Sequence, residues 1–436
     1  MQSMFMENVE RLFGDMIKTF LYSTKDKIKS AYLWNTVAAM FNAFQTVIIL
    51  MLISRIDPII DAGVFTIAFA IGNLMMTIGK YGIRQFQVSD VEEKYSFKEY
   101  LTSRVGTTVI MIFASFIYVG YNHITGLYNI EKCIVILLIC LAKAVDAFED
   151  VFHGMLQQYL RLDVAGKILT IRLFTYIVVY LAVYLVSQDL VVTSLVALLI
   201  SVVQFAVLNY IALKGFQMKK KTLRYKNVWK LLVECLPLFI AAYLVMYIGN
   251  APKYAIDKVM SSEAQACFTY IFMPVFVISL LSQFVYQPVI SKLAMLWHQD
   301  KLQEFSKLIL RQIGLILGLS AMAVVSGYLL GIPVLSLIYG VNLNEYKTAL
   351  VILLLGGSAL AFVNFLQMII TVARKQNLLN IGYFLAFFAF LLLGKSVVKE
   401  YGIVGISIFY TLVVLGIGIT FGIITVLIIK RKYKEK

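Results

Sequence analysis

The feature that most constrains this chain is a succession of apolar runs, each about 18 residues or longer, that recur from Ile28 to Ile429. A helix rises about 1.5 Å per residue, so a run of about 20 residues crosses the hydrocarbon core of a bilayer. Inside that core every backbone N–H and C=O group must be bonded within the protein, which restricts so long a segment to an α-helix. The runs therefore predict a helical membrane protein with many passes.

About twelve spans are expected. They fall near residues 31–54, 62–82, 99–120, 133–157, 165–186, 190–213, 229–250, 264–290, 306–330, 347–371, 378–398 and 403–429. The composition agrees, because hydrophobic residues make up 61% of the 436 and charged residues only 14%, whereas about a quarter of the residues of a soluble domain are charged. The predicted fold class is an all-α polytopic membrane protein.

The Lys and Arg residues predict the orientation. Basic loops stay in the cytoplasm, and the most basic connections are KGFQMKKKTLRYKN (214–227) and KRKYKEK (430–436). We therefore expect a multi-pass protein of the cytoplasmic (inner or plasma) membrane with both termini in the cytoplasm. Topology and contacts with anionic lipid account for most of the net charge of +15, so no nucleic-acid partner is expected.

The chain divides into two sets of six spans. We expect an N-terminal cytoplasmic or interfacial arm (1–27), an N-terminal lobe (28–213), a basic cytoplasmic linker (214–228), a C-terminal lobe (229–430) and a basic tail (431–436). RIDPIIDAGVFTIAF (55–69) is weakly similar to AIDKVMSSEAQACFTYIF (255–272). Because six is an even number, both lobes enter the membrane from the same side, so the repeats would be related by a pseudo-twofold axis along the membrane normal.

The fourth span, which ends in LAKAVDAFEDVFHGMLQQ (141–158), is the least apolar. At about 100° per residue its polar side chains fall within an arc of roughly 120°. They are Lys143, Asp146, Glu149, Asp150, His153 and Gln157. Each charge at the bilayer centre costs about 2.5–3.5 kcal/mol, so this polar stripe cannot face lipid. It lines an aqueous cavity or belongs to a buried ion-pair network.

Two ion pairs can be placed from the spacing. Lys143 and Asp146 are three residues apart on one helix and can pair locally. Arg172 lies about as far into the fifth span as Glu149 and Asp150 lie from the inner end of the fourth, so a salt bridge from Arg172 to Glu149 or Asp150 is expected.

Neither catalysis nor a resident cofactor is predicted. No Walker motif, GxSxG or HExxH pattern occurs, so ATP-driven transport by this chain and ordinary hydrolase chemistry lack support. The four cysteines lie within or at the ends of spans without the spacing of a metal site. They are Cys133, Cys140, Cys235 and Cys267. We interpret the chain as a protein that is not an enzyme and has no metal site.

Three segments carry a family resemblance. DAGVFTIAFAIGNLMMTIGKYGIRQFQVSD (61–90), FEDVFHGMLQQYLRLDVAGK (148–167) and LPLFI…GNAPKYAID (236–257) resemble the polysaccharide-transporter branch, the O-antigen or repeat-unit flippases, of the multidrug/oligosaccharidyl-lipid/polysaccharide exporter superfamily. The resemblance implies two six-helix lobes around a central cavity. It also implies translocation of polyprenyl-diphosphate-linked oligosaccharide across the cytoplasmic membrane by alternating access, for O-antigen, capsule or exopolysaccharide. Membrane lipid, a polysaccharide polymerase and chain-length components would be further partners.

This substrate suggests roles for the intramembrane charges. Arg and Lys balance the charge of a diphosphate, and the candidate substrate-binding residues are Arg172, Lys143, Lys80, Arg84 and Lys253. Lys80 and Arg84, at the inner end of the second span, would capture the head group, and Lys253, near the outer mouth, would help to release it.

The carboxylates and the histidine of the polar stripe would couple transport to an ion gradient. The candidates are Asp146, Glu149, Asp150 and His153, because such groups in a cavity exchange a proton or hold a cation. The coupling ion is left open. Two other functions are weighed. A multidrug or cation antiporter shares the superfamily plan, and a membrane polysaccharide polymerase would need a larger outer loop.

Overall fold

The computed structural model describes residues 16–56, 59–90, 92–214 and 223–434. The predicted arm is thus described only from residue 16, and parts of the predicted linker (215–222) and tail (435–436) lie outside the described residues. The elements are α2 (Lys27–Ile56), α3 (Ile59–Lys80), α4 (Ile83–Ser89), α5 (Phe97–Ile124), α6 (Ile130–Gln158), α7 (Leu162–Ser187), α8 (Leu190–Leu213), α9 (Tyr225–Asp257), α10 (Ser262–Tyr286), η1 (Gln287–Val289), α11 (Ile290–His298), α12 (Leu302–Tyr339), η2 (Asn344–Tyr346), α13 (Lys347–Val372), η3 (Gln376–Leu378) and α14 (Leu379–Lys434).

The predicted all-α polytopic fold is confirmed, since the chain is helical wherever the structure describes it, apart from short turns. Ten of the described helices are long and apolar enough to cross a membrane. The difference from the predicted twelve has two causes: α6 carries too many charges to qualify, and α14 covers the last two predicted spans.

A single residue divides α14. Gly402 has φ 58° and ψ −147°, which interrupts the helix. Residues on either side of this break pack against each other: the ring centroids of Phe390 and Phe409 lie 5.1 Å apart, and those of Tyr383 and Phe421 lie 5.3 Å apart. The segment is therefore a hairpin of two helices, as its two predicted spans require.

Short polar signals set where several helices begin. Ser96 and Glu99 form a capping box at the start of α5, in which each side chain bonds the backbone N–H of the other. Asn129 caps α6 and Asp189 caps α8. In the eighth predicted span, Pro288 lies in η1 and separates α10 from α11. These helix starts, together with the proline turn, fix how far along its helix each charged side chain lies.

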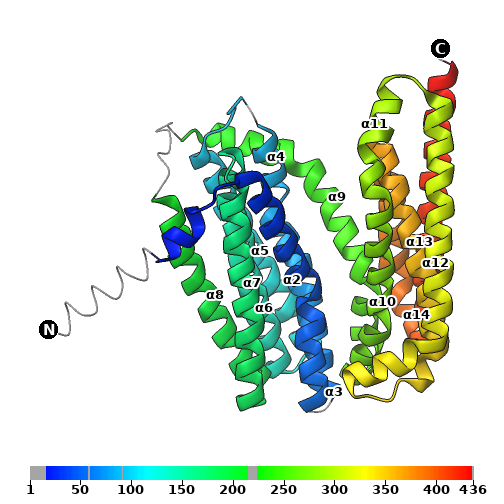
Figure 1. Ribbon diagram of the computed structural model, residues 1–436. Coiled ribbons are helices and arrows are strands. Elements are labelled where there is room, and N and C mark those ends of the chain that lie inside the picture. The colour runs from blue at the N-terminus through cyan, green and yellow to red at the C-terminus, as the bar shows by residue number, and fades with distance from the viewer. Residues whose placement is uncertain (1–15, 57–58, 91, 215–222, 435–436) are drawn as a thin grey trace. The chain divides into compact units, whose positions relative to one another are not determined.

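The chain forms two compact units. One consists of Met1–Asp57 and Ala68–Tyr243 and the other of Pro58–Ile67 and Leu244–Lys436, so both α3 and α9 contribute to each. In the first unit α2 packs on α7, α5 on α6, and α8 on both α6 and α7 (Figure 1). In the second unit α13 packs on α10, α12 and α14. The predicted lobe boundaries and pseudo-twofold axis stay a prediction.

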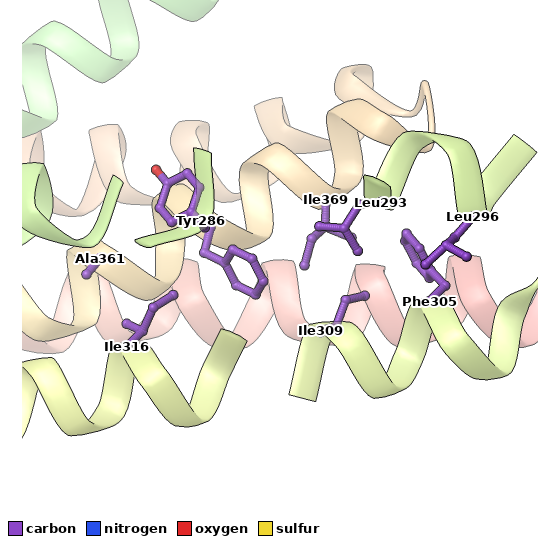
Figure 2. Packing of buried hydrophobic residues seen from close by; sticks show 9 residues of the cluster. Tyr286, Leu293, Leu296, Phe305, Ile309, Ile316, Ala361 and Ile369 are labelled. Atoms are coloured by element: carbon purple, nitrogen blue, oxygen red, sulfur yellow. The ribbon is translucent and has the colours of Figure 1, made fainter. Parts of the chain in front are cut away.

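The second unit has a continuous apolar core (Figure 2). Tyr286 of α10, Leu293 of α11, and Phe305 and Ile309 of α12 meet Phe365 of α13 there, and all are buried. Polar side chains join the same helices, since Asn364 donates to Ser279 at 2.7 Å. This core packs α11 and α12 against α13.

The described end of the arm is attached to the first unit. Residues 16–22 are helical and Leu21 is fully buried against residues of α6, α7 and α8. The ammonium of Lys167 donates to the carbonyls of Phe20 and Leu21, at 2.7 and 3.3 Å, and to the hydroxyl of Thr24 at 2.8 Å. A cation at a helix C-terminus is favourable because the unpaired carbonyls there are partly negative.

The first half of α9 is joined to the loop before α5. Lys94 donates to both carboxylate oxygens of Glu234, at 2.8 and 3.1 Å, and Tyr95 donates to the same group at 3.0 Å. The hydrogen bond that Lys94 donates to Glu234 raises the pKa of Lys94 above its ordinary value. Asn227 also donates to Glu99 at 2.7 Å. These contacts all lie within the first unit.

Candidate functional site

The polar stripe of α6 is the centre of the candidate site. Its side chains face protein, because Lys143, Glu149, Asp150 and His153 are all buried. The charges that meet them come from α4, α5 and α7, and an amide comes from α8. Of the two arrangements left open above, the buried ion-pair network describes this part of the stripe.

Arg172 of α7 joins two of the carboxylates. It forms an ion pair with Glu149 and donates to Asp146 at 2.8 Å. Asn209 of α8 donates to the second oxygen of Glu149 at 2.6 Å. The expected pair of Arg172 with Glu149 is confirmed, and so is the local pair of Lys143 with Asp146, at 3.6 Å.

Asp150 has different partners from those expected. Arg84 of α4 reaches one of its oxygens at 3.2 Å, and Arg104 of α5 reaches the other at 3.0 Å. Of the two partners predicted for Arg172, Glu149 is therefore the one observed, because two arginines from other helices already occupy Asp150. Arg84 also donates to Gln157 at 3.1 Å, so two side chains of α6, about two turns apart, bind the guanidinium.

His153 stands apart from these bonds. Its Nε2 lies 3.8 Å from Glu149 and has no hydrogen-bond partner among the described residues, and the residue is buried. A buried polar atom without a partner is costly, and a proton on it would face the Glu149 carboxylate.

The edge of the network is more accessible than its centre. The side chains of Asp146 and Arg84 are 29% and 27% exposed, whereas that of Glu149 is 1% exposed. Lys80, at the end of α3, is half-buried and lies within electrostatic range of Asp146 and Asp150. It has no ion pair with any described residue. A ligand would therefore meet Lys80, Arg84 and Asp146 first.

The network carries more positive than negative charge. Arg84, Arg104, Lys143 and Arg172 meet the three carboxylates of Asp146, Glu149 and Asp150. One positive charge is left over with His153 neutral, and Lys80 adds a second. Such a surplus, in a setting where charges are weakly screened, favours an anion.

Lys253 lies in the second unit and belongs to no such network. It is buried in α9, and its ammonium lies 5.8 Å from the centre of the Phe272 ring. No described residue forms an ion pair with it. The structure thus brings together Arg172, Lys143, Arg84 and the four candidate coupling residues, places Lys80 beside them, and leaves Lys253 by itself.

Sequence reasoning missed Arg104 and Asn209. Arg104 was a detectable signal, being a charge inside the predicted span 99–120, and its side chain is completely buried. Asn209, in the span 190–213, resembled the many amides that bond between membrane helices. Among the residues that the structure describes, no group of three or more His, Cys, Asp or Glu could hold a metal ion.

No family model matches the chain. A curated relative, the capsular polysaccharide biosynthesis protein CapF of Staphylococcus aureus, is 23% identical over 383 residues, which cover 86% of this chain and 93% of that protein.

Two solved transporters are similar over nearly their whole length. The inward-facing conformation of a multidrug resistance MATE family transporter of the MOP superfamily gives a TM-score of 0.59 at 13% identity, covering 94% of this chain and 99% of that one. The eukaryotic MATE transporter AtDTX14 gives 0.60 at 11% identity, covering 97% and 98%. The chain thus has the fold of the MATE transporters of the MOP superfamily.

Proposed function

We propose that this chain, which has the MATE fold, translocates polyprenyl-diphosphate-linked oligosaccharide repeat units across the cytoplasmic membrane for a surface polysaccharide such as capsule. One observation carries the proposal: the network on α6 has four cationic partners for three carboxylates, and Lys80 lies beside it without an ion pair among the described residues. A diphosphate is the kind of group that Arg and Lys bind most strongly. CapF, a relative named for capsular polysaccharide biosynthesis, supports the same substrate class.

The candidate residues divide by exposure. Lys80 and Arg84, at the accessible edge, would capture the diphosphate, and Arg172 and Lys143 would bind it once it displaces Asp146. Lys253 would bind the head group at a later stage, in the second unit. Asp146, Glu149, Asp150 and His153 would take up the coupling ion, with the Nε2 of His153, which no described residue bonds, as the place for a proton. The cycle would use alternating access, with both termini in the cytoplasm.

Export of a cationic drug is the second candidate, because a solved transporter with this fold is a multidrug resistance protein. A cation would need a site with surplus negative charge. The described network has the opposite sign, which favours the lipid-linked anion.

The test is translocation by the purified protein in proteoliposomes. A fluorescent polyprenyl-diphosphate-linked oligosaccharide is placed in the inner leaflet, and its arrival in the outer leaflet is read with an impermeant reagent. The wild type should translocate it, and Lys80→Ala with Arg84→Ala should slow it at least about tenfold. Lys132→Ala changes a half-buried lysine in the first turn of α6; it is the matched control and should transport normally. A wild type that ignores a panel of lipid-linked sugars and expels a cationic dye would assign the chain to drug export.

A further inference from the structure

The corner between α3 and α4 has a fixed and unusual backbone. α3 ends at Lys80 and α4 begins at Ile83. Between them Tyr81 and Gly82 have φ values of 47° and 69°. A Cβ atom on Gly82 would also lie 2.8 Å from the Cβ of Leu238. Glycine is needed here because an L residue disfavours this φ and has no room. Lys80 and Arg84 therefore stand on the two sides of a corner whose path allows little variation.

Arg104 reaches this corner from α5. One nitrogen of its guanidinium donates to the carbonyl of Gly79 at 2.7 Å, and the other donates to Asp150 at 3.0 Å. Thr107, one turn later, donates to the same carbonyl at 2.8 Å. Gly79 lies in the last turn of α3, where carbonyls lack partners within the helix and the helix dipole favours a cation.

The contact continues to the other side of the corner. Asp150 binds Arg104 through one oxygen and Arg84 through the other. Arg104 thus holds the end of α3 directly and the start of α4 through Asp150. The guanidinium holds two donor nitrogens in one fixed plane, one for each acceptor, whereas all the donors of a lysine lie on a single nitrogen.

We propose that Arg104 is a positioning residue, which does not touch the substrate but fixes Lys80 and Arg84 in the arrangement that captures an anionic head group. Its side chain is completely buried, so it acts only through Gly79 and Asp150. This inference rests on the proposed function for the identity of the anion and on the corner geometry for the role.

The first test is a double-mutant cycle on binding of polyprenyl diphosphate, without sugar, to the full chain in nanodiscs. Arg104→Gln should raise Kd about tenfold in the wild-type background. In a Lys80→Ala/Arg84→Ala background the same change should raise Kd less than about twofold, because there is nothing left to position. Equal losses in both backgrounds would mean that Arg104 only holds the fold, which would overturn the proposal.

Two further variants separate geometry from charge. Arg104→Lys keeps the charge but is shorter and carries all its donors on one nitrogen, so it loses the fixed geometry of the fork, and we expect an intermediate loss of binding. Thr107→Val removes the other donor to the Gly79 carbonyl without changing a charge, and it should bind as the wild type does.

The mobility of a spin label at position 80 reports on the corner without any substrate. A spin label on Lys80→Cys, with the four buried cysteines replaced by alanine, should become more mobile with Arg104→Gln and stay unchanged with Thr107→Val. If wild type fails to bind polyprenyl diphosphate, the proposed function fails, and the label still decides the role of Arg104. A label equally immobile in wild type and Arg104→Gln would overturn the positioning role.

Discussion

Glu149 and Asp150 of the α6 network are held by different arginines. Glu149, with 1% of its side chain exposed, depends on Arg172 and Asn209, whereas Asp150 depends on Arg84 and Arg104. A buried ion pair adds little net stability over apolar residues of the same size, but losing one partner strands the other charge. Removing both partners should therefore be less harmful than removing one.

We expect Arg172→Met to destabilise the protein by about 3–5 kcal/mol, because it leaves Glu149 buried with an uncompensated charge. The double variant Arg172→Met/Glu149→Gln should recover most of that loss. Chemical unfolding in detergent micelles measures both free energies. If the double variant is as unstable as the single one, the stranded charge is not the cause.

A substitution at Gly79 tests how closely α3 packs against α5 and α6. A Cβ atom there would lie 2.7 Å from the sulfur of Met111 and 2.8 Å from the Cβ of Ala147. We expect Gly79→Ala to cost about 1–3 kcal/mol in the free energy of unfolding, as overpacking does. Gly106→Ala is the matched control: nothing lies within 4 Å of its Cβ, so it should be neutral or slightly stabilising. Equal effects at the two sites would contradict the packing.

The sequence alone predicted part of the α6 network. Depth in the helix was enough to pair Arg172 with Glu149, because the fourth and fifth spans follow each other along the chain. It could not pair Arg104 with Asp150, since periodicity gives the face of a helix but not the identity of its neighbour. The partner of Asp150 depends on which helices pack together, and that is decided by the whole fold.

Helices are the elements that hydropathy predicts best, and the differences between the predicted spans and the observed helices have physical causes. α6 does not qualify as a span by composition because it carries too many charged residues, although arginines from neighbouring helices pair with those of its polar stripe. The eighth span, predicted over 264–290, lies within the apolar segment Ser262–His298, but α10 ends at Tyr286 and Pro288 lies in the short turn η1 before α11. Proline lacks the N–H that would continue the helix.

The break in α14 at Gly402 can be tested by substitution. Its φ of 58° and ψ of −147° belong to a region that residues with a Cβ atom rarely adopt, yet a Cβ there would meet no atom within 4 Å. Gly402→Ala should therefore cost about 1–3 kcal/mol through backbone strain alone. Gly416→Ala, in the helical part of α14 and equally free of neighbours, is the control and should not destabilise. Thermal unfolding of both in the same detergent compares them, and equal midpoints would show that the hairpin does not need glycine.

For the molecule as a whole, most of the buried charged residues that the structure describes lie in the first of the two units. The network lies in the first unit, while the second has Lys253, buried and without an ion pair among the described residues. The sequence predicted a cation at this position. It could not predict that the lysine would stand by itself, because the aromatic ring beside it, Phe272, comes from α10.

A buried ammonium without a counter-ion is a cost that a fold would not keep for stability. Lys253→Met should therefore stabilise the protein, by about 1–3 kcal/mol, since it replaces the charge with an apolar chain of similar length. If Lys253 binds the diphosphate, the same variant should lose transport of the lipid-linked oligosaccharide. Gain in stability with loss of transport is the expected outcome, because functional groups are kept at the expense of the fold.

Lys258→Met provides the comparison, because Lys258 lies just after α9 and is exposed. The free energy of unfolding of Lys258→Met should differ from that of the wild type by no more than about 0.5 kcal/mol, and the variant should transport normally. Unfolding in micelles and translocation in proteoliposomes are measured on the same preparations. A Lys253→Met protein that is more stable and transports fully would remove Lys253 from the substrate path, and one that is less stable would mean that the ammonium has a structural partner.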